Sequence, residues 1–490
     1  MKQNQSPAPQ AAPGATRELA RFLARTALAD MPAEVVTRAK HLMLDGFGCG
    51  LLSAKLDWSR RAVETLHALD GDGPASVWGW TVKVPPMSAA LLNGTFIQGF
   101  ELDDYHPYGP LHSEACALPA VIGTAEQLGG VDGKRLLEAA VLGFEVGPRI
   151  GMAMGGLQLV SRGWHCGSVY GVLSGAAGAG KIRRLDENQF EDAIGTAATQ
   201  ACGLMSAQFE AMVKRMHSGM AARSGVLAAA LAGAGFTGIK RVLERDFGGF
   251  AKTFCGDDPF DLSQLTKRLG KQWEVMRIAV KPAYSAMAGT HSAIEGALKL
   301  RAMPGFSVGK IKEIRIGTTE AMLHHGGFKL ERPATAIGAQ MSHRYVVAVT
   351  LIDGTPSVPQ FSPKRINSDD VWKLLERIHA YQDREIDSRG EEGRWGTRLI
   401  AIFTDGRTEE IEVRYPKGGE KFPLTNREIV GKYDRLAALV MDPRHAAELK
   451  EMVLDLERCK DVGELSRLLA TGVSSPFKDW RAGSIGVSSR

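Results

Sequence analysis

The sequence predicts a mainly α protein with an α/β lid, in which a smaller α+β domain is inserted into a large all-helical domain. Apolar residues recur at the helical period through most of the chain up to residue 270. Beyond residue 271, short runs alternate between apolar and polar residues, which is typical of strands. Helical periods return after residue 417. The chain of 490 residues is long enough for such a division.

The helical domain is predicted over residues 16–270. Its helices are expected at 16–28, 32–46, 56–69, 86–99, 117–128, 133–147, 167–181, 186–201 and 220–233, with a further short one at 241–247. Residues 76–84 form the one strong strand-like run. The chain has 56 glycines, and many lie inside these helices, where each costs about 1 kcal/mol relative to Ala. We expect close helix–helix contacts to offset that cost.

The lid is predicted over residues 271–417. Residues 313–317 alternate as a short strand, and residues 334–351 have the helical period. The clearest hairpin is at 398–414, where Asp405-Gly406 separates two alternating runs. These elements predict a small sheet flanked by helices.

The C-terminal region, residues 418–475, is predicted to form helices that pack back on the helical domain. Thr425 and Glu428 have the spacing of a capping box at the start of the first of them. The two ends, residues 1–15 and 476–490, are expected to be a disordered tail and a loose tail.

Composition excludes several classes of protein. The net charge of +5 is modest, and basic and acidic residues are interspersed, which does not favour nucleic-acid binding. No apolar run reaches about 18–20 residues without charges, so a membrane span is not expected. Residues 1–15 have no hydrophobic core, so a secretory signal is not expected, and the six cysteines are scattered without Cys-x-x-Cys pairs. We therefore expect reduced thiols and a cytoplasmic location.

Three polar segments interrupt the apolar helices, at residues 101–119, 163–167 and 214–219. The first packs carboxylates, histidines and tyrosines around prolines that favour turns and extended backbone. A dense polar segment between buried helices is costly unless it is paired or functional. We therefore predict that the three segments meet at one cleft that binds a small, carboxylate-rich molecule.

Metal, nucleotide and thiol chemistry are less favoured alternatives. Competent metal ligands are present at Asp104, His106, His112 and His165, but no His-Glu-x-x-His or Cys-x-x-Cys spacing accompanies them. The glycine-rich run at 174–180 lies inside an apolar helix, unlike a phosphate-binding loop. Cys166 adjoins His165, but sequence neighbours on a loop usually point apart. We expect no metal and no cofactor.

The favoured chemistry is proton transfer next to a carboxylate. Removing a proton from the carbon beside a carboxylate, or removing CO2 from an unsaturated acid, builds negative charge that fixed cations stabilise. Lys214, Arg215 and Lys281 are candidates for those cations, and the histidines for the acid/base group. Nearby carboxylates are expected to raise a histidine pKa.

Five motifs give the chain a family resemblance. They are Glu-Leu-Asp-Asp-Tyr-His…Leu-His-Ser (101–113), Gly-Trp-His-Cys-Gly (163–167), Ala-Cys-Gly-Leu-Met-Ser-Ala-Gln (201–208), Met-Val-Lys-Arg (212–215) and Glu-Arg-Pro…Gln-Met-Ser…Tyr (331–345). Together they resemble the MmgE/PrpD family, which includes 2-methylcitrate dehydratase, cis-aconitate decarboxylase and an iminodisuccinate epimerase. Within the family the resemblance is closest to the fungal cis-aconitate decarboxylases.

The resemblance implies a cofactor-free homodimer with a cleft between the helical domain and the lid. It implies that His112 is the principal acid/base, that Asp104 orders its loop, and that His165 binds or protonates the substrate. It further implies that Lys214 and Lys281 hold carboxylates and that Tyr345 closes the pocket from the lid. The predicted catalytic residues are thus His112, His165, Lys214, Asp104 and Tyr345, and the predicted substrate-binding residues are Glu101, Tyr105, His106, Arg215 and Lys281.

The activity expected from this resemblance is decarboxylation of cis-aconitate to itaconate. A 2-methylcitrate dehydratase-like hydro-lyase, an epimerase of a dicarboxylic amino or imino acid, and a non-catalytic binding protein stay open as alternatives. The chain departs from its relatives at Tyr105, where many members carry Thr, and at Ala286, where the mammalian decarboxylase has a histidine. His343 and Arg344 lie next to Tyr345 and are candidates for additional charge in the pocket or for the surface of a helix.

Overall fold

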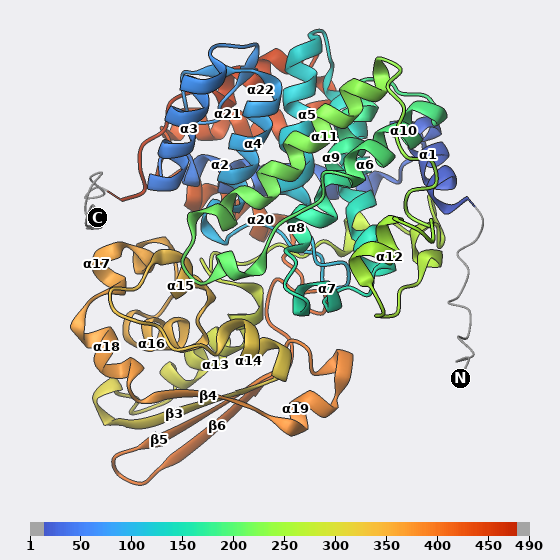
Figure 1. The fold of residues 1–490 in the computed structure, drawn as a ribbon. Helices are drawn as coiled ribbons and strands as arrows, with labels where there is room; N and C mark the ends of the chain where they lie inside the picture. Colours follow the sequence, from blue (N-terminus) through green and yellow to red (C-terminus); the bar gives the residue numbers. More distant parts are fainter. Residues whose placement is uncertain (1–13, 478–490) are drawn as a thin grey trace, which may run out of the picture.

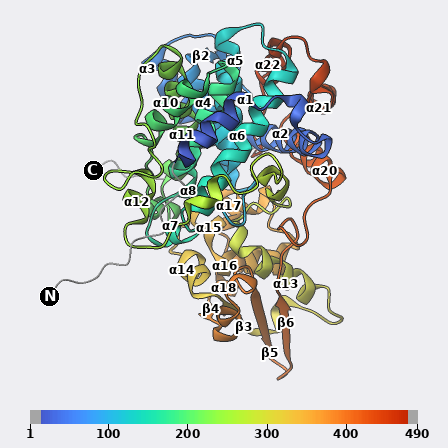
Figure 2. The same cartoon turned by 90° about the vertical axis from the view of Figure 1, so that its right-hand side faces the viewer.

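The computed structural model describes residues 14–477. A helical body forms one end of the molecule, and a smaller part with a mixed sheet lies beneath it (Figure 1). The view turned by 90° shows the same two layers, with the sheet furthest from the helical body (Figure 2). The predicted fold class is confirmed. The predicted tails lie almost wholly outside the described residues.

The helical body contains most of the helices. They are α1 (Ala15–Arg25), α2 (Ala33–Ser53), α3 (Asp57–Asp70), α4 (Pro86–Ile97), α5 (Ser113–Leu128), α6 (Gly133–Ala153), α7 (Gln158–Ser161), α8 (Cys166–Val169), α9 (Gly171–Ile182), α10 (Glu187–Ala198), α11 (His217–Gly233), α12 (Phe250–Cys255), α20 (Asn426–Ala437), α21 (Pro443–Leu454) and α22 (Val462–Leu469).

Two sequence predictions in this body differ from the structure. The run at 76–84 is not one strand but two short paired strands, β1 (Ala75–Ser76) and β2 (Lys83–Val84), because Gly79 turns the chain with a φ of 73°. The expected short helix at 241–247 consists of turns, since Arg241 has a left-handed φ of 55° that a helix does not accommodate.

The smaller part is built on a four-stranded sheet of order β4-β3-β5-β6. Strand β3 (Ile311–Thr318) runs parallel to β4 (Ile378–Gln382) and antiparallel to β5 (Thr397–Phe403). Strand β6 (Thr408–Val413) completes the predicted hairpin across Asp405-Gly406. The accompanying helices are α13 (His291–Arg301), α14 (Glu320–Gly326), α15 (Ala336–Met341), α16 (His343–Asp353), α17 (Pro363–Ile366), α18 (Asp369–Leu375) and α19 (Arg384–Ser388).

The helix expected at 334–351 is divided into α15 and α16. Ser342 lies between them with extended backbone, φ −93° and ψ 118°, and its hydroxyl accepts a hydrogen bond from the backbone N–H of Tyr345. A serine in this conformation caps a new helix rather than continuing the old one.

The C-terminal helices lie against the helical body, and α20 runs beside α2 (Figure 2). The predicted capping box is present, because Thr425 accepts from the backbone of Glu428 while the Glu428 carboxylate accepts from the backbone of Thr425. Within the described residues, no helix is both long and apolar enough to cross a bilayer.

Glycine permits a close helix contact in the body, between α4 and α11. A Cβ atom added at Gly219 would lie 2.1 Å from the carbonyl oxygen of Leu91 and 2.8 Å from the hydroxyl of Thr95. Gly94 faces the same contact, where an added Cβ would lie 2.7 Å from the Cα of Gly219. The helices touch backbone to backbone, as expected from the glycine content.

We expect Gly219→Ala to lower the free energy of unfolding by about 1–3 kcal/mol, because backbone atoms must move to admit the methyl group. The matched control is Gly233→Ala at the end of the same helix, where the added Cβ would meet Leu185 at an ordinary 3.4 Å. Thermal unfolding followed by circular dichroism compares the two variants. Equal melting temperatures would contradict the close-contact explanation.

Candidate active site

A pocket of about 130 Å³ lies between the helical body and the smaller part. This is a small pocket, suited to a metabolite rather than to a large cofactor. The predicted site residues that line it are Glu101, Tyr105, His106, His112, His165, Lys214 and Lys281. The predicted residues Asp104, Arg215 and Tyr345 are not among the lining residues. The structure therefore brings side chains from all three polar segments to one place.

The loop that precedes α5 carries most of these side chains. It begins at Glu101, whose backbone has a left-handed φ of 57°. Tyr105 exchanges two backbone hydrogen bonds with Ala279, of 2.9 and 2.8 Å. The Asp104 carboxylate accepts hydrogen bonds from the backbone N–H groups of Ser113 and Glu114, at 2.8 and 3.2 Å, at the start of α5. Asp104 thus links the loop to the start of α5 behind the pocket and does not line the pocket.

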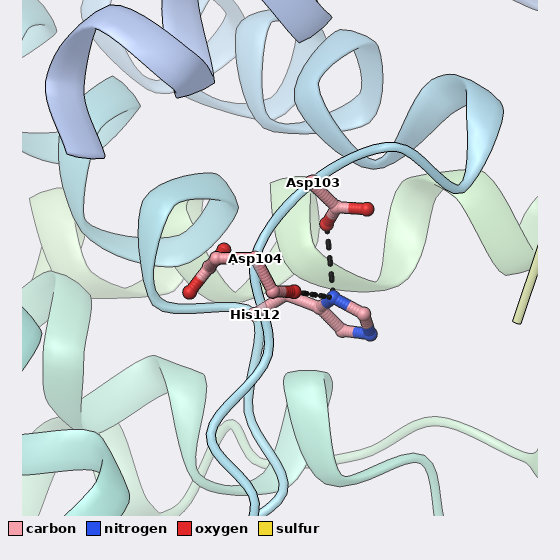
Figure 3. A group of neighbouring side chains, drawn as sticks. All are labelled: Asp103, Asp104 and His112. Atoms are coloured by element: carbon pink, nitrogen blue, oxygen red, sulfur yellow. Dashed lines mark hydrogen bonds and ion pairs between the residues drawn. The ribbon is translucent and has the colours of Figure 1, made fainter. Parts of the chain in front are cut away.

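The imidazole of His112 is held through one ring nitrogen. Its Nδ1 lies 2.8 Å from the backbone oxygen of Asp104 and 2.9 Å from the carboxylate of Asp103 (Figure 3). The other ring nitrogen points away from both residues (Figure 3). Burial lowers the pKa of His112, but the charge and the close contact of Asp103 outweigh burial and raise this pKa above its usual value.

Asp103, which contacts His112, is a candidate site residue that sequence reasoning missed. It is fully buried, and its pKa lies below its usual value because His112 and Lys281 outweigh the effect of burial. The Asp-Asp pair was visible in the sequence, but only the structure distinguishes the carboxylate that caps α5 from the one that contacts the imidazole.

Asp103, Asp104 and His112 also offer three potential ligand atoms within 4.8 Å of one another. The Nδ1 of His112 is already engaged by the Asp103 carboxylate and the Asp104 backbone oxygen, and the Asp104 carboxylate accepts from two backbone N–H groups. A metal ion would need these same atoms. The donor set therefore fits a carboxylate–imidazole pair better than a metal centre.

Glu101 gathers three cations at the floor of the pocket. Its carboxylate contacts Lys214, lies 2.6 Å from Arg215 and lies 3.5 Å from Lys281. Burial raises the pKa of Glu101, but these three charges outweigh burial and hold the pKa well below its usual range. Lys281 also lies 3.5 Å from Asp103. Three cations thus face two carboxylates, and this excess of positive charge favours binding of an anion.

Arg215 does not reach the pocket, contrary to its predicted substrate contact. Its guanidinium is fully buried and donates to Glu101 and to the side-chain oxygen of Gln340. Gln340 in turn donates to the backbone oxygen of Phe100 at 3.0 Å. Arg215 therefore donates through both terminal nitrogens to other protein side chains, and it holds Glu101 in place without lining the pocket.

His165 lies beside His112, with the two rings nearly parallel and their centroids 6.2 Å apart. His217, at the start of α11, lies 4.8 Å from His165 on its other side. Burial, then the charges of His217 and Lys214, keep the pKa of His165 well below its usual value. Burial and Lys214 lower the pKa of His217 to about 4. Of these three rings, His112 alone has a raised pKa.

Tyr345 does not close the pocket. Its side chain is fully buried in the smaller part, and its hydroxyl donates to the backbone oxygen of Gln360 at 2.5 Å. Its ring packs on Phe361. His343 is also buried, and it is not among the lining residues. Arg344 donates to two backbone oxygens of the smaller part. None of the three adds charge to the pocket.

His106 lines the pocket with a ring whose nitrogens are already engaged. Its Nδ1 accepts a hydrogen bond from the backbone N–H of Gly109 at 2.9 Å, and its Nε2 lies 3.3 Å from Glu274. Tyr105 lines the pocket beside Trp395, with ring centroids 5.4 Å apart. His106 therefore stabilises the loop, while the Tyr105 ring forms part of the pocket wall.

The smaller part contributes residues that no motif indicated. His325 of α14 lines the pocket and lies 3.0 Å from the side-chain oxygen of Gln208, and burial and Lys214 lower its pKa to about 4. Apolar side chains form the rest of this wall, namely Met287, Met322, Met341 and Trp395. Their contribution depends on how the two parts face each other, which local sequence does not encode.

Comparisons with known proteins agree with the motif resemblance. The MmgE/PrpD N-terminal domain matches residues 17–263, and the MmgE/PrpD C-terminal domain matches residues 284–458. A cis-aconitate decarboxylase-like protein of Aspergillus oryzae is 40% identical over 471 residues, covering 93% of this chain and 97% of the relative. Cis-aconitate decarboxylase of Aspergillus terreus is 37% identical over 480 residues, covering 95% and 97%. The mouse cis-aconitate decarboxylase is 26% identical over 451 residues, covering 89% of each chain. The chain therefore belongs to the MmgE/PrpD family.

Proposed function

We propose that the protein is a cofactor-independent carboxy-lyase that converts cis-aconitate to itaconate and CO2, and that it works as a homodimer. One observation carries the catalytic part of the proposal: a pocket-lining imidazole, supported by Asp103, lies in the same pocket as two lysines. Similarity to fungal cis-aconitate decarboxylases supports the choice of substrate.

In the proposed reaction, Lys214 and Lys281 bind two carboxylates of cis-aconitate. The bond between the methylene carbon and the third carboxylate breaks, and CO2 leaves. The electron pair of that bond forms the new terminal double bond, while the original double bond shifts its electrons to the methine carbon. The charge that develops there is shared with the attached carboxylate, where a lysine stabilises it.

His112 completes the reaction by donating the proton on Nε2 to the methine carbon, which becomes the methylene of itaconate. Its raised pKa keeps the imidazolium populated near neutral pH, which a general acid requires. His165, with a lowered pKa, is neutral and serves as a hydrogen-bonding partner for the substrate. Solvent then returns a proton to His112.

The test is to incubate the purified protein with cis-aconitate in D2O and to follow CO2 and the product by NMR. The proposal predicts CO2 release and one deuterium in the itaconate methylene. A parallel incubation with 2-methylcitrate tests the hydro-lyase alternative, in which ultraviolet absorbance rises without CO2. Deuterium uptake without loss of CO2 or water would instead indicate an epimerase. Absence of turnover of cis-aconitate would contradict the proposal.

Lys214→Ala is expected to raise the KM for cis-aconitate by roughly 10- to 100-fold, since a charged hydrogen bond to a ligand is worth about 1.5–3 kcal/mol. Glu101 keeps Arg215 and Lys281 in this variant, so the floor of the pocket retains its charge pairs. Steady-state kinetics measures the change, with Lys299→Ala on the exposed face of α13 as the control. A KM equal to that of the unmodified protein would remove Lys214 from the binding assignment.

A further inference from the structure

A buried ion pair lies behind the pocket, between two helices that are far apart in the sequence. Lys432 of α20 places its Nζ 2.8 Å from the carboxylate of Asp45 on α2, and neither side chain is exposed. Burying such a pair seldom adds stability compared with apolar side chains of the same size. The Lys432–Asp45 pair is therefore a candidate for a role in positioning the pocket residues.

Lys432 has a second partner in the loop that forms the pocket. Its Nζ donates to the backbone oxygen of Leu102. Leu102 stands between Glu101, which gathers the three cations, and Asp103, which contacts His112. Lys432 thus hydrogen-bonds to the backbone between Glu101 and Asp103. The carboxylates of these two residues set the charge of the pocket.

The loop needs external support at this point. Glu101 has a left-handed backbone, which costs a non-glycine residue about 1–3 kcal/mol and persists only where the surroundings hold it. Downstream, the loop is tied by Tyr105 to Ala279 and by Asp104 to α5. At Leu102 the contact comes from Lys432 on the C-terminal helix.

Helix α20 comes close enough for this contact because α2 has a glycine where the helices cross. A Cβ atom added at Gly48 would lie 3.1 Å from the ring of Tyr433, the neighbour of Lys432. Burial lowers the pKa of Lys432, but Asp45 outweighs burial and keeps this pKa above its usual value. The ammonium group therefore keeps its protons and can serve Asp45 and Leu102 together.

We propose that Lys432 is a positioning residue of the active site, which holds the Leu102 carbonyl so that Asp103 meets His112, and that Asp45 keeps Lys432 charged and oriented. The C-terminal helix α20 would then be part of the catalytic apparatus and not only of the fold. The kinetic consequences rest on the proposed decarboxylase activity, whereas the effect on the His112 titration does not.

Loss of this support has a defined electrostatic consequence. The charged and titratable groups around His112 are Asp103, Asp104, Glu101, Lys281, Lys214 and His165. Those around Lys432 are Asp45, Cys49, Glu114 and His291. If the loop relaxes at Leu102, the contact between Asp103 and His112 lengthens. The pKa of His112 then falls toward its ordinary value, and the alkaline limb of the pH–kcat profile moves to lower pH.

Two variants separate positioning from stability. Lys432→Met leaves Asp45 buried without a partner, so both stability and activity are expected to fall. Asp45→Leu combined with Lys432→Met removes both charges and adds no side-chain donor, and most of the lost melting temperature is expected to return. Because no donor to Leu102 is restored, kcat is expected to stay about 10- to 100-fold low, with a smaller change in KM. Full recovery of kcat together with stability in the double variant would overturn the proposal.

The matched control is Tyr433→Phe on the same helix. The Tyr433 hydroxyl donates to the backbone oxygen of Ala446 on α21, away from the loop, so its loss should leave kcat and the pH profile unchanged. NMR titration of isotope-labelled histidine, with the His112 signal assigned by its loss in His112→Ala, gives a readout without turnover. An unshifted His112 titration in the folded double variant would overturn the proposal even if cis-aconitate is not the substrate.

Discussion

His112→Ala is expected to lower kcat with cis-aconitate by more than about 100-fold, the usual scale for loss of a general acid or base. In the proposed reaction no other neighbouring imidazole replaces it, because burial keeps His165 and His217 neutral. The KM should change much less, since Lys214 and Lys281 keep their positions around Glu101. Single-turnover measurements of CO2 release isolate the affected step.

The control for this variant is His67→Ala on α3, a partly exposed histidine whose ring contacts Asp72. It should have the kcat of the unmodified protein. The pH profile gives a second check. The acid form of His112 is required and its pKa is raised, so activity should persist through neutral pH and fall as pH rises through that raised pKa. Unchanged kcat in His112→Ala would remove this residue from the mechanism.

Asp103→Asn is expected to have the second largest effect, a decrease of about 100- to 1000-fold in kcat. The neutral amide removes the charge that raises the pKa of His112, and it can present an N–H group to the ring nitrogen that now faces a carboxylate. The imidazolium is then less populated near neutral pH and loses the carboxylate that orients it, while Nδ1 still donates to the backbone oxygen of Asp104.

The direction of the pH change distinguishes this explanation from simple misfolding. Without the Asp103 charge, the pKa of His112 falls, so the alkaline limb of the kcat profile should move to lower pH. The comparison variant is Asp104→Asn, in which the amide oxygen can replace only one of the two carboxylate oxygens that accept from Ser113 and Glu114, so some loss of stability is expected. Its alkaline limb should move less than that of Asp103→Asn, because the Asp104 carboxylate caps α5 whereas the Asp103 carboxylate contacts the imidazole. A limb that stays in place in Asp103→Asn would contradict the assigned role of Asp103.

Helical periods and one hairpin were enough to predict the architecture from the sequence. The division of α15 from α16 was not predictable, because the apolar period continues across Ser342 and only its backbone conformation interrupts it. The short strands around Gly79 were read as one run for a similar reason, since a turn with positive φ leaves little trace in an alternating pattern. Periodicity reports which faces are buried, not where the backbone changes direction.

For the candidate site too, the sequence predicted some features, while others were visible only in the structure. Sequence reasoning selected residues by type and spacing, and it identified His112, His165 and Lys214 in three separate segments. It could not tell which polar side chains hydrogen-bond to other protein groups instead of lining the pocket, as Arg215 and Tyr345 do. Residues that the tertiary fold brings to the loop from far away, such as Lys432, carry no local signal at all.

The proposed mechanism requires a polyanion to bind with its carboxylates at Lys214 and Lys281 and its carbon chain beside His112. The most direct measurement is a crystal structure of the protein with tricarballylate, a saturated tricarboxylate that cannot undergo the reaction. We expect two of its carboxylates within about 3 Å of the two lysine Nζ atoms, and its carbon chain beside Nε2 of His112. A ligand bound elsewhere, or one whose carbon chain faces away from His112, would contradict the proposed site.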